Sequence, residues 1–229
     1  MKQFTKCFLG LLLIIFTSNC AKPRLVKLPP VIEGWHKSSA LKNAYIVQKM
    51  NTLYSIAWSF GVDYRHLATI NKLKAPYQLH PGQHLYIASS SESIKYRPKS
   101  VNNKSLAKWF WPATGRIIAT FSDKMGGNKG IDINGIYGQP IFASNSGRVV
   151  YSGTGIRSYG KLIIIKHNDD YLSAYAYNKK MLVEEGQEIK AHQKIAEMGY
   201  DNERHACLHF EIRLFGKPVN PLFYLPKQQ

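Results

Sequence analysis

The sequence predicts an α+β module of βααβ order followed by a mostly antiparallel all-β domain. Three observations predict this organisation. Apolar residues in the segment 53–60 recur at helical spacing, and short strand candidates lie on either side of this helical region. From residue 109 onward, no window of about 11 residues has helical spacing. Instead, short runs rich in β-branched and aromatic residues alternate with glycine and asparagine turns, which is typical of antiparallel sheets.

Composition and charge limit the class of protein. The chain has 229 residues, of which 45% are hydrophobic and 20% charged, so it suits one or two globular domains. Its net charge of +17 would suit a polyanionic partner, but the basic residues are spread singly and form no block. We therefore expect no nucleic acid partner. Three cysteines are too few for a disulfide-stapled scaffold.

The first segment, residues 1–19, has the pattern of a secretory signal peptide. Two lysines precede an apolar run at residues 8–16, which is shorter than the roughly 20 residues that a membrane-spanning helix needs. Residues 17–20 (TSNC) resemble a bacterial lipobox, in which cleavage precedes a cysteine that becomes acylated. The resemblance implies that Cys20 is the lipidation site, and Ala21 in place of aspartate implies the outer membrane.

A compact block at residues 45–88 lies between two segments without apolar periodicity. Residues 20–44 contain several prolines, so we expect a tether there. Residues 89–108 combine serines, asparagines and basic side chains, so we expect a basic linker. A further domain then occupies residues 109–229.

The block itself predicts two helices between two strands. Four apolar residues in 53–60 form one helical face, which Asn51 or Thr52 can cap at its start and Gly61 at its end. Asp63 can cap a second helix. The expected strands cover residues 45–49 and 84–87.

Several short sequences in the block carry a family pattern. They are Tyr45-Ile46-Val47, Thr52-Leu53, Ile56-Ala57, Phe60-Gly61, Leu67, Asn71 and Pro81-Gly82-Gln83. With these residues the block resembles a LysM domain over nearly its whole length. It departs from the family at Met50-Asn51, where Gly-Asp is usual. The resemblance implies binding to the N-acetylglucosamine chains of peptidoglycan.

The remaining residues, 109–229, predict one antiparallel domain. The expected strands cover residues 116–121, 140–143, 148–151, 162–166, 172–177, 194–198 and 208–213. The run Leu162-Ile163-Ile164-Ile165 is apolar on both faces, so we expect a central strand that is buried on both sides. About 115 residues are enough for one core.

This domain also carries the pattern of a known family. The matching residues are Trp111-Pro112, Gly115, Asn128-Lys129-Gly130-Ile131-Asp132-Ile133, Gly138-Gln139-Pro140-Ile141, Gly147-Arg148-Val149-Val150, Tyr159-Gly160, Lys166-His167, Tyr175-Ala176-Tyr177, Gly186, Ile189 and Leu208-His209-Phe210-Glu211-Ile212-Arg213. They resemble the LytM (lysostaphin-like) metallopeptidase domain over roughly residues 109–225. The resemblance implies the LytM-type fold, a duplicated hybrid motif.

The chain departs from that family at the residues that carry catalysis. An active member holds zinc with the His and Asp of H-x-x-x-D and the second His of H-x-H, while two further histidines transfer protons. The matching positions here are Asn128 and Asp132, then Cys207 and His209, with Tyr177 in place of the remaining histidine. Two of three zinc ligands and neither proton-transferring histidine are kept. We therefore expect no catalytic residue, no metal and no cofactor.

The order of lipobox, LysM block, basic linker and degenerate LytM domain resembles the NlpD-type lipoproteins. The resemblance implies a non-enzymatic activator of periplasmic N-acetylmuramoyl-L-alanine amidases, which split septal peptidoglycan as daughter cells separate. It implies an outer membrane lipoprotein that faces the periplasm, is enriched at the septum and binds the glycan strands. The five residues at the degenerate zinc site are then expected to converge in a groove that binds the amidase.

Two other functions stay open at this point. A zinc-dependent endopeptidase with unusual ligands is conceivable, because a cysteine thiolate is a good zinc ligand. A passive lipoprotein that links the outer membrane to the wall is the other alternative. For the activator, we expect the LysM block to contribute by raising the local concentration on intact wall.

Overall fold

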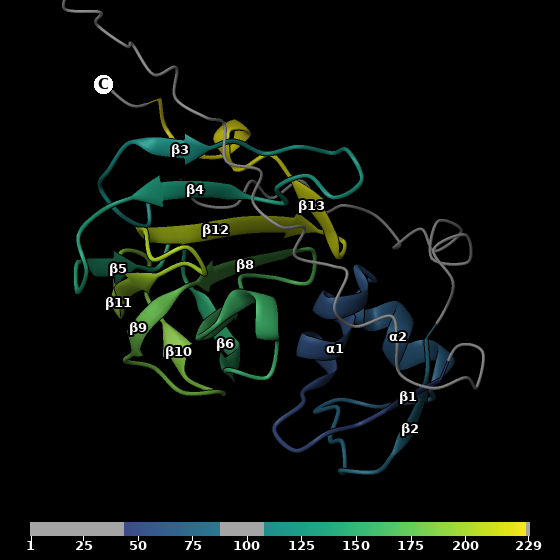
Figure 1. Ribbon diagram of the computed structural model, residues 1–229. Coiled ribbons are helices and arrows are strands. Elements are labelled where there is room, and N and C mark those ends of the chain that lie inside the picture. Colours follow the sequence, from purple (N-terminus) through teal and green to yellow (C-terminus); the bar gives the residue numbers. More distant parts are fainter. Residues whose placement is uncertain (1–43, 88–107, 228–229) are drawn as a thin grey trace, which may run out of the picture.

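The computed structural model describes residues 44–87 and 108–227 (Figure 1). The predicted signal peptide, Cys20 and nearly all of the tether and of the basic linker lie outside the described residues. We call residues 44–87 the module and residues 108–227 the sheet domain. Among the described residues, no helix is long and apolar enough to cross a membrane.

The module has the predicted βααβ order. Strands β1 (Ala44–Ile46) and β2 (His84–Tyr86) pair antiparallel, and helices α1 (Leu53–Phe60) and α2 (Tyr64–Ile70) lie between them in sequence. In Figure 1 the two helices stand over the two-stranded ribbon. The first strand is shorter than expected and begins one residue earlier, at Ala44.

Local side chains fix both helices at the expected ends. Thr52 is the N-cap of α1 and accepts a hydrogen bond from the main-chain N–H of Ser55, whose own hydroxyl accepts one from Thr52 N–H. Gly61 ends the helix in the left-handed region, with φ +62°. Asp63 caps α2 by accepting from the N–H of Arg65. The capping predictions for Thr52, Gly61 and Asp63 are therefore confirmed.

In the described part of the chain, the sheet domain holds one sheet of eleven strands, and every strand pair is antiparallel. The strands are β3 (Ile117–Ala119), β4 (Ile131–Asn134), β5 (Pro140–Phe142), β6 (Gly147–Gly153), β7 (Leu162–Lys166), β8 (Tyr171–Ala176), β9 (Asn178–Met181), β10 (Glu188–Ile189), β11 (Lys194–Tyr200), β12 (Ala206–Leu214) and β13 (Lys217–Val219). Two short 3-10 helices complete it, η1 (Arg157–Tyr159) and η2 (Pro221–Phe223). The fold class predicted from the sequence is confirmed.

Four of these strands were not expected from the sequence. β10 has only two residues, and β9 is a polar segment that pairs with β11 alone, so neither has an alternating apolar pattern. β13 pairs with β12 alone and contains a proline, which is tolerated at such an edge. β4 does alternate, but four residues are too few for a sequence pattern to stand out.

The central strand β7 is buried on both sides, as its sequence predicts. Residues 162–165 are each 0% exposed, and β7 lies between β6 and β8. Ile163 and Ile165 face the main core of the sheet domain. Leu162 and Ile164 face a second cluster, which also contains Trp58 of the module. One face of the sheet is therefore covered in part by a helix from the other end of the chain (Figure 1).

Candidate functional site

A row of polar side chains lies along one face of β12. Cys207, His209, Glu211 and Arg213 alternate with apolar residues of the main core, so they share the face opposite that core. All four are buried, at 0–3% exposed. Because β12 pairs with β4 so that His209 lies opposite Asp132, the sheet register brings these two side chains together.

Both ring nitrogens of His209 are engaged by carboxylates. Nδ1 lies 2.6 Å from Oδ1 of Asp132, and Nε2 lies 3.1 Å from Oε1 of Glu211. Burial alone would lower the pKa of His209, but the hydrogen bonds to the two carboxylates outweigh it and raise the pKa to about 9. The ring is therefore an imidazolium that donates both protons at neutral pH.

Glu211 and Arg213 continue this arrangement along the strand. Burial would raise the pKa of Glu211, but the adjacent Arg213 and His209 lower it to about 2. Nε of Arg213 donates to Oε2 of Glu211 at 3.0 Å, and the hydroxyl of Tyr159 donates to Oε1 at 2.6 Å. Negative and positive groups thus alternate from Asp132 to Arg213, and each buried charge has a partner of opposite sign.

Glu211, Arg213 and Tyr159 match the family pattern in the sequence, but the sequence does not place them in the site. A usable signal was present: polar residues occupy every second position of an otherwise apolar strand, at 207, 209, 211 and 213. Such a pattern on a buried strand indicates a paired polar row.

Tyr177 lies over this row at the end of β8. Its ring centroid is 5.9 Å from that of His209, and its main-chain N–H donates to the carbonyl of Tyr159 at 3.0 Å. The residue is partly exposed and has φ +63°. Burial, followed by the charge of Asp132, raises the pKa of its phenol, so the hydroxyl stays protonated at neutral pH.

The remaining two predicted site residues are Cys207 and Asn128, and only Cys207 shares the strand face of His209. Cys207 is on the same strand face as His209, and burial, with Asp201 and Asp132 nearby, raises the pKa of its thiol. Asn128 is partly buried, and its Oδ1 accepts from the N–H of Gly130 at 3.2 Å, while its Nδ2 is buried without a hydrogen-bond partner.

The structure therefore brings Asp132, His209 and Tyr177 into contact and places Cys207 beside them. The hydrogen bonds of the Asn128 side chain and main chain are local, to Gly130 and Ser122. Asn128 and Tyr177 are partly exposed, whereas Asp132, Cys207 and His209 are at most 3% exposed. Their hydrogen bonds and ion pairs within the sheet keep these side chains beneath the surface.

Only two of the three zinc-ligand positions, Asp132 and His209, carry a side chain that suits a catalytic zinc ion. These two side chains contact each other at 2.6 Å, and the second ring nitrogen of His209 faces Glu211. The third position, Asn128, offers only a neutral amide. Among residues 44–87 and 108–227, no group of three or more His, Cys, Asp or Glu side chains could hold a metal ion.

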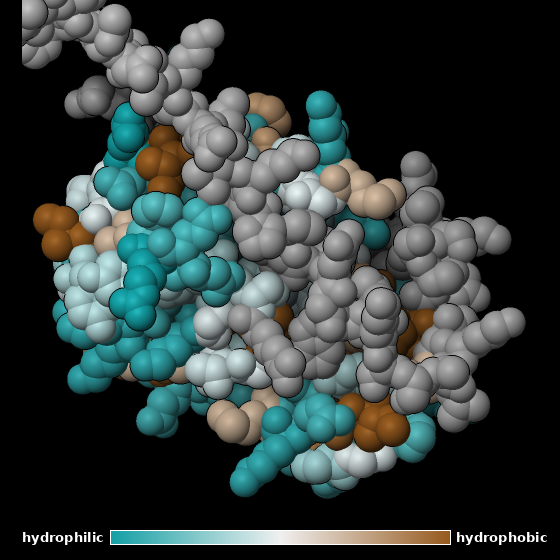
Figure 2. All heavy atoms as spheres, in the orientation of Figure 1, coloured by the Kyte–Doolittle hydropathy of each residue, from teal (hydrophilic) through white to brown (hydrophobic). Residues whose placement is uncertain are grey.

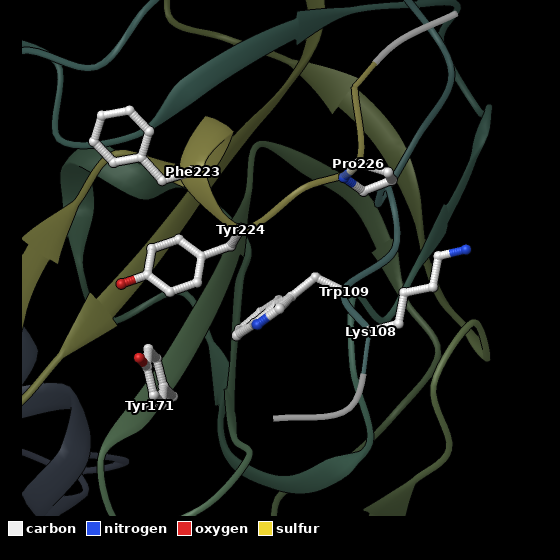
Figure 3. Close-up of a pocket in the computed structure, with 6 residues that line it drawn as sticks. All are labelled: Lys108, Trp109, Tyr171, Phe223, Tyr224 and Pro226. Atoms are coloured by element: carbon white, nitrogen blue, oxygen red, sulfur yellow. The ribbon is translucent and has the colours of Figure 1, made fainter. Parts of the chain in front are cut away.

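A separate pocket lies at the other end of β8. It is lined by Lys108, Trp109, Tyr171, Phe223, Tyr224 and Pro226 (Figure 3). Tyr171 pairs with Leu214, five residues along β12 from the position of His209, so the pocket is distinct from the polar row. In Figure 3 the rings of Trp109, Tyr171 and Tyr224 gather around one space, and the ring centroids of Trp109 and Tyr224 are 5.9 Å apart.

The exposed apolar side chains of the sheet domain are scattered. In the coloured part of the face in Figure 2, most residues are hydrophilic or intermediate, and hydrophobic residues form small separate groups. An exposed aromatic pair lies next to β12, since Tyr200 of β11 pairs with Ala206. Tyr137 stacks on Tyr200 with ring centroids 4.6 Å apart, and Lys179 Nζ lies 4.6 Å from the Tyr137 ring.

Family models match both parts of the chain. The LysM domain matches residues 45–88, and peptidase family M23 matches residues 126–221. The class of protein is thus a LysM module followed by a domain of the M23 peptidase fold, which agrees with the βααβ module and the antiparallel sheet.

Curated relatives narrow the class further. The Escherichia coli "Murein hydrolase activator NlpD" is 40% identical, with 84% of this chain and 70% of the relative covered. The "Lipoprotein NlpD/LppB homolog" of Pseudomonas aeruginosa is 38% identical, with 92% and 83% covered. The "Outer membrane antigenic lipoprotein B" of Haemophilus influenzae is 38% identical, with 83% and 66% covered. The chain belongs to the NlpD family of murein hydrolase activator lipoproteins.

Proposed function

We propose that this protein is a non-catalytic activator of a periplasmic N-acetylmuramoyl-L-alanine amidase. In this role it binds peptidoglycan and promotes the splitting of the septal wall during daughter-cell separation. Family membership supports an activator role in peptidoglycan cleavage. The observation that carries the non-catalytic part is the arrangement of the site, in which Asn128, Tyr177 and Cys207 stand beside Asp132 and His209 at positions that hold histidines in active members.

The same geometry argues against hydrolysis by the chain itself. Water attack on a peptide bond needs a group that accepts a proton near neutral pH. The imidazolium of His209 already carries both of its protons, and the pKa values of Tyr177 and Cys207 are raised, so neither side chain is a base at that pH. In the proposal, the charged side chains of the row stabilise one another and keep the site in its folded geometry, and they transfer no proton.

We place the amidase contact at the degenerate zinc site, formed by Asn128, Asp132, Tyr177, Cys207 and His209. Tyr177 and Asn128 are the two partly exposed members, so they meet the partner directly. The Nδ2 group of Asn128 is buried without a hydrogen-bond partner, so the contact with the amidase uses the exposed remainder of this residue. Asp132, Cys207 and His209 act from beneath by fixing the position of Tyr177.

The rest of the chain sets where this contact occurs. In the proposal, residues 1–19 are the signal peptide, Cys20 is acylated, and residues 20–44 tether the protein to the outer membrane on its periplasmic side. The LysM domain at 45–88 binds glycan strands, and the linker 89–108 leads to the peptidase-like domain, 109–229. Enrichment at the division septum follows from binding to the wall that the amidase cleaves.

Dye-labelled peptidoglycan tests the proposal. The full chain is incubated with the label alone, the cognate amidase is incubated alone, and the two are combined. We expect label release by the amidase to rise when the chain is added, and no release by the chain alone. Absence of stimulation would favour a passive wall-binding lipoprotein, and release by the chain alone would favour the endopeptidase.

Two variants locate the contact. Tyr177→Asp should abolish stimulation while circular dichroism shows a folded protein, since aspartate tolerates the positive φ of this position. Lys227→Glu makes a charge change at an exposed C-terminal position away from the site and should stimulate fully. Full stimulation by a folded Tyr177→Asp variant would move the contact elsewhere and leave the activator role standing.

A further inference from the structure

The module is docked on the same face of the sheet that carries the polar row. Trp58 of α1 is 3% exposed, and it belongs to the cluster formed by β6, β7, β8 and the segment around η1. That cluster includes Ala174 and Ala176, and Ala176 lies opposite His209 in the sheet register. The module and the candidate site therefore share one surface of the sheet (Figure 1).

Arg213 joins the two parts at the centre of this contact. Its guanidinium lies 3.5 Å from the ring centroid of Trp58, and its Nη1 donates to the main-chain carbonyl of Trp58 at 2.7 Å. The same guanidinium pairs with Glu211 at 3.0 Å. Arginine suits such a position, because its planar group can stack on a ring and donate at its edge together.

Tyr159 provides a second connection between the module and the site. Its ring packs against Trp58 with centroids 6.5 Å apart and against His209 with centroids 5.7 Å apart. Its hydroxyl donates to Glu211, and its carbonyl accepts from the N–H of Tyr177. A continuous chain of contacts thus runs from Trp58 to the residue that covers His209.

Polar contacts around the edge fix the orientation of the module. The hydroxyl of Thr52 donates to the carbonyl of Val150 at 3.2 Å. Arg65 Nη1 donates to Asp170 Oδ1 at 3.2 Å. The backbones of the module and the sheet domain also approach closely at Gly216. A Cβ added there would lie 2.5 Å from the carbonyl oxygen of Val62.

We propose that the module is a fixed wall of the candidate site, and that Trp58 is a positioning residue that keeps the polar row closed through Arg213 and Tyr159. If the module leaves the sheet, Arg213 loses the ring and the carbonyl that hold it, and Glu211 and Tyr159 lose one side of their packing. The row then opens more often to solvent. From the sequence, the module is expected to bind glycan strands and to raise the local concentration on the wall, but not to contact the site. The new proposal does not depend on the amidase.

The thiol of Cys207 reports on this coupling. It is 1% exposed and belongs to the polar row, so its alkylation requires local opening. In a full chain with Cys7→Ser and Cys20→Ser, Cys207 is the sole cysteine, and iodoacetamide labelling followed by mass spectrometry gives its rate. We expect Trp58→Ala to raise that rate about tenfold, which corresponds to about 1.4 kcal/mol of local stability. Trp58→Phe, which keeps an aromatic face for Arg213, should restore most of the protection.

A glycine pair separates undocking from general destabilisation. Gly216→Ala pushes a methyl group against Val62, whereas Gly186→Ala, at a similar positive φ, meets nothing within 4 Å. We expect faster labelling in Gly216→Ala and the wild-type rate in Gly186→Ala, each in the same cysteine-reduced background. If Trp58→Ala does not fold, this pair decides the question. Labelling of folded Gly216→Ala within about twofold of wild type, or equal acceleration in both glycine variants, would overturn the proposal.

Discussion

The behaviour of single residues in the candidate site depends on their neighbours more than on their type. His209 and Asp132 could be assigned to a zinc site from the sequence, because both match ligand positions of the peptidase pattern. The sequence could not show that the two would bond to each other, or that Glu211 would occupy the second ring nitrogen. Those contacts depend on strand register, which brings residues 77 positions apart within 2.6 Å.

Replacement of Asp132 tests the energy of the buried charges. Asp132→Asn leaves the positive ring of His209 with one carboxylate partner in place of two, so we expect a loss of about 3 kcal/mol in the free energy of unfolding. Urea denaturation measures it. Glu188→Gln is the control, because it breaks an exposed pair with Arg148 and should cost less than about 1 kcal/mol. Equal effects of the two variants would contradict a buried ion-pair row.

The pH dependence of stability follows from the raised pKa of His209. The folded value is about 9 and the ordinary value is 6.5, so the folded state holds the proton more tightly. This stabilisation is complete below pH 6.5 and is lost as the pH rises through 9. We expect the free energy of unfolding to fall between pH 7 and pH 9, and urea titrations at both values measure it. The decrease should be smaller in Asp132→Asn; an equal decrease would assign it to another group.

At the scale of helices and strands, elements with a local sequence signal could be predicted, whereas strands that pair only at an edge of the sheet could not. The caps of α1 and α2 were predictable because each cap uses residues within three positions of it. The doubly buried β7 was predictable from its unbroken apolar run. β9 and β13 carry no such signal, since each is defined by one neighbouring strand that lies elsewhere in the sequence.

The pairing of β4 with β12 depends on Gly130. A Cβ at this position would lie 2.1 Å from the carbonyl oxygen of Phe210, so the two backbones could not keep their spacing. We expect Gly130→Ala to lower the free energy of unfolding by about 2–3 kcal/mol and to speed hydrogen exchange of β4 amides. Gly186→Ala should cost about 1 kcal/mol from its positive φ and leave β4 exchange unchanged. Unchanged exchange in a folded Gly130→Ala variant would contradict this close approach.

At the scale of the whole molecule, the two parts share a hydrophobic cluster that a linear sequence does not reveal. Trp58 lies within a segment whose helical spacing already accounts for a module core through Leu53, Ile56 and Ala57. The sequence therefore gives no sign that Trp58 packs against anything outside the module. The apolar residues Leu162 and Ile164 did predict that the second face of β7 is covered. In the structure, the η1 segment and α1 both pack against that face.

We expect the position of the molecule in the cell to depend on acylation of Cys20, which lies outside the described residues. One acyl chain binds a membrane only marginally, whereas a diacylated or triacylated cysteine anchors a protein stably. We expect the wild-type chain in the outer membrane fraction and the Cys20→Ala variant outside it, as shown by cell fractionation and immunoblotting. Cys7→Ala, which changes a cysteine within the predicted signal peptide, should fractionate like wild type. Unchanged membrane association of Cys20→Ala would show that the apolar segment 8–16 is itself the anchor and that the lipobox prediction is wrong.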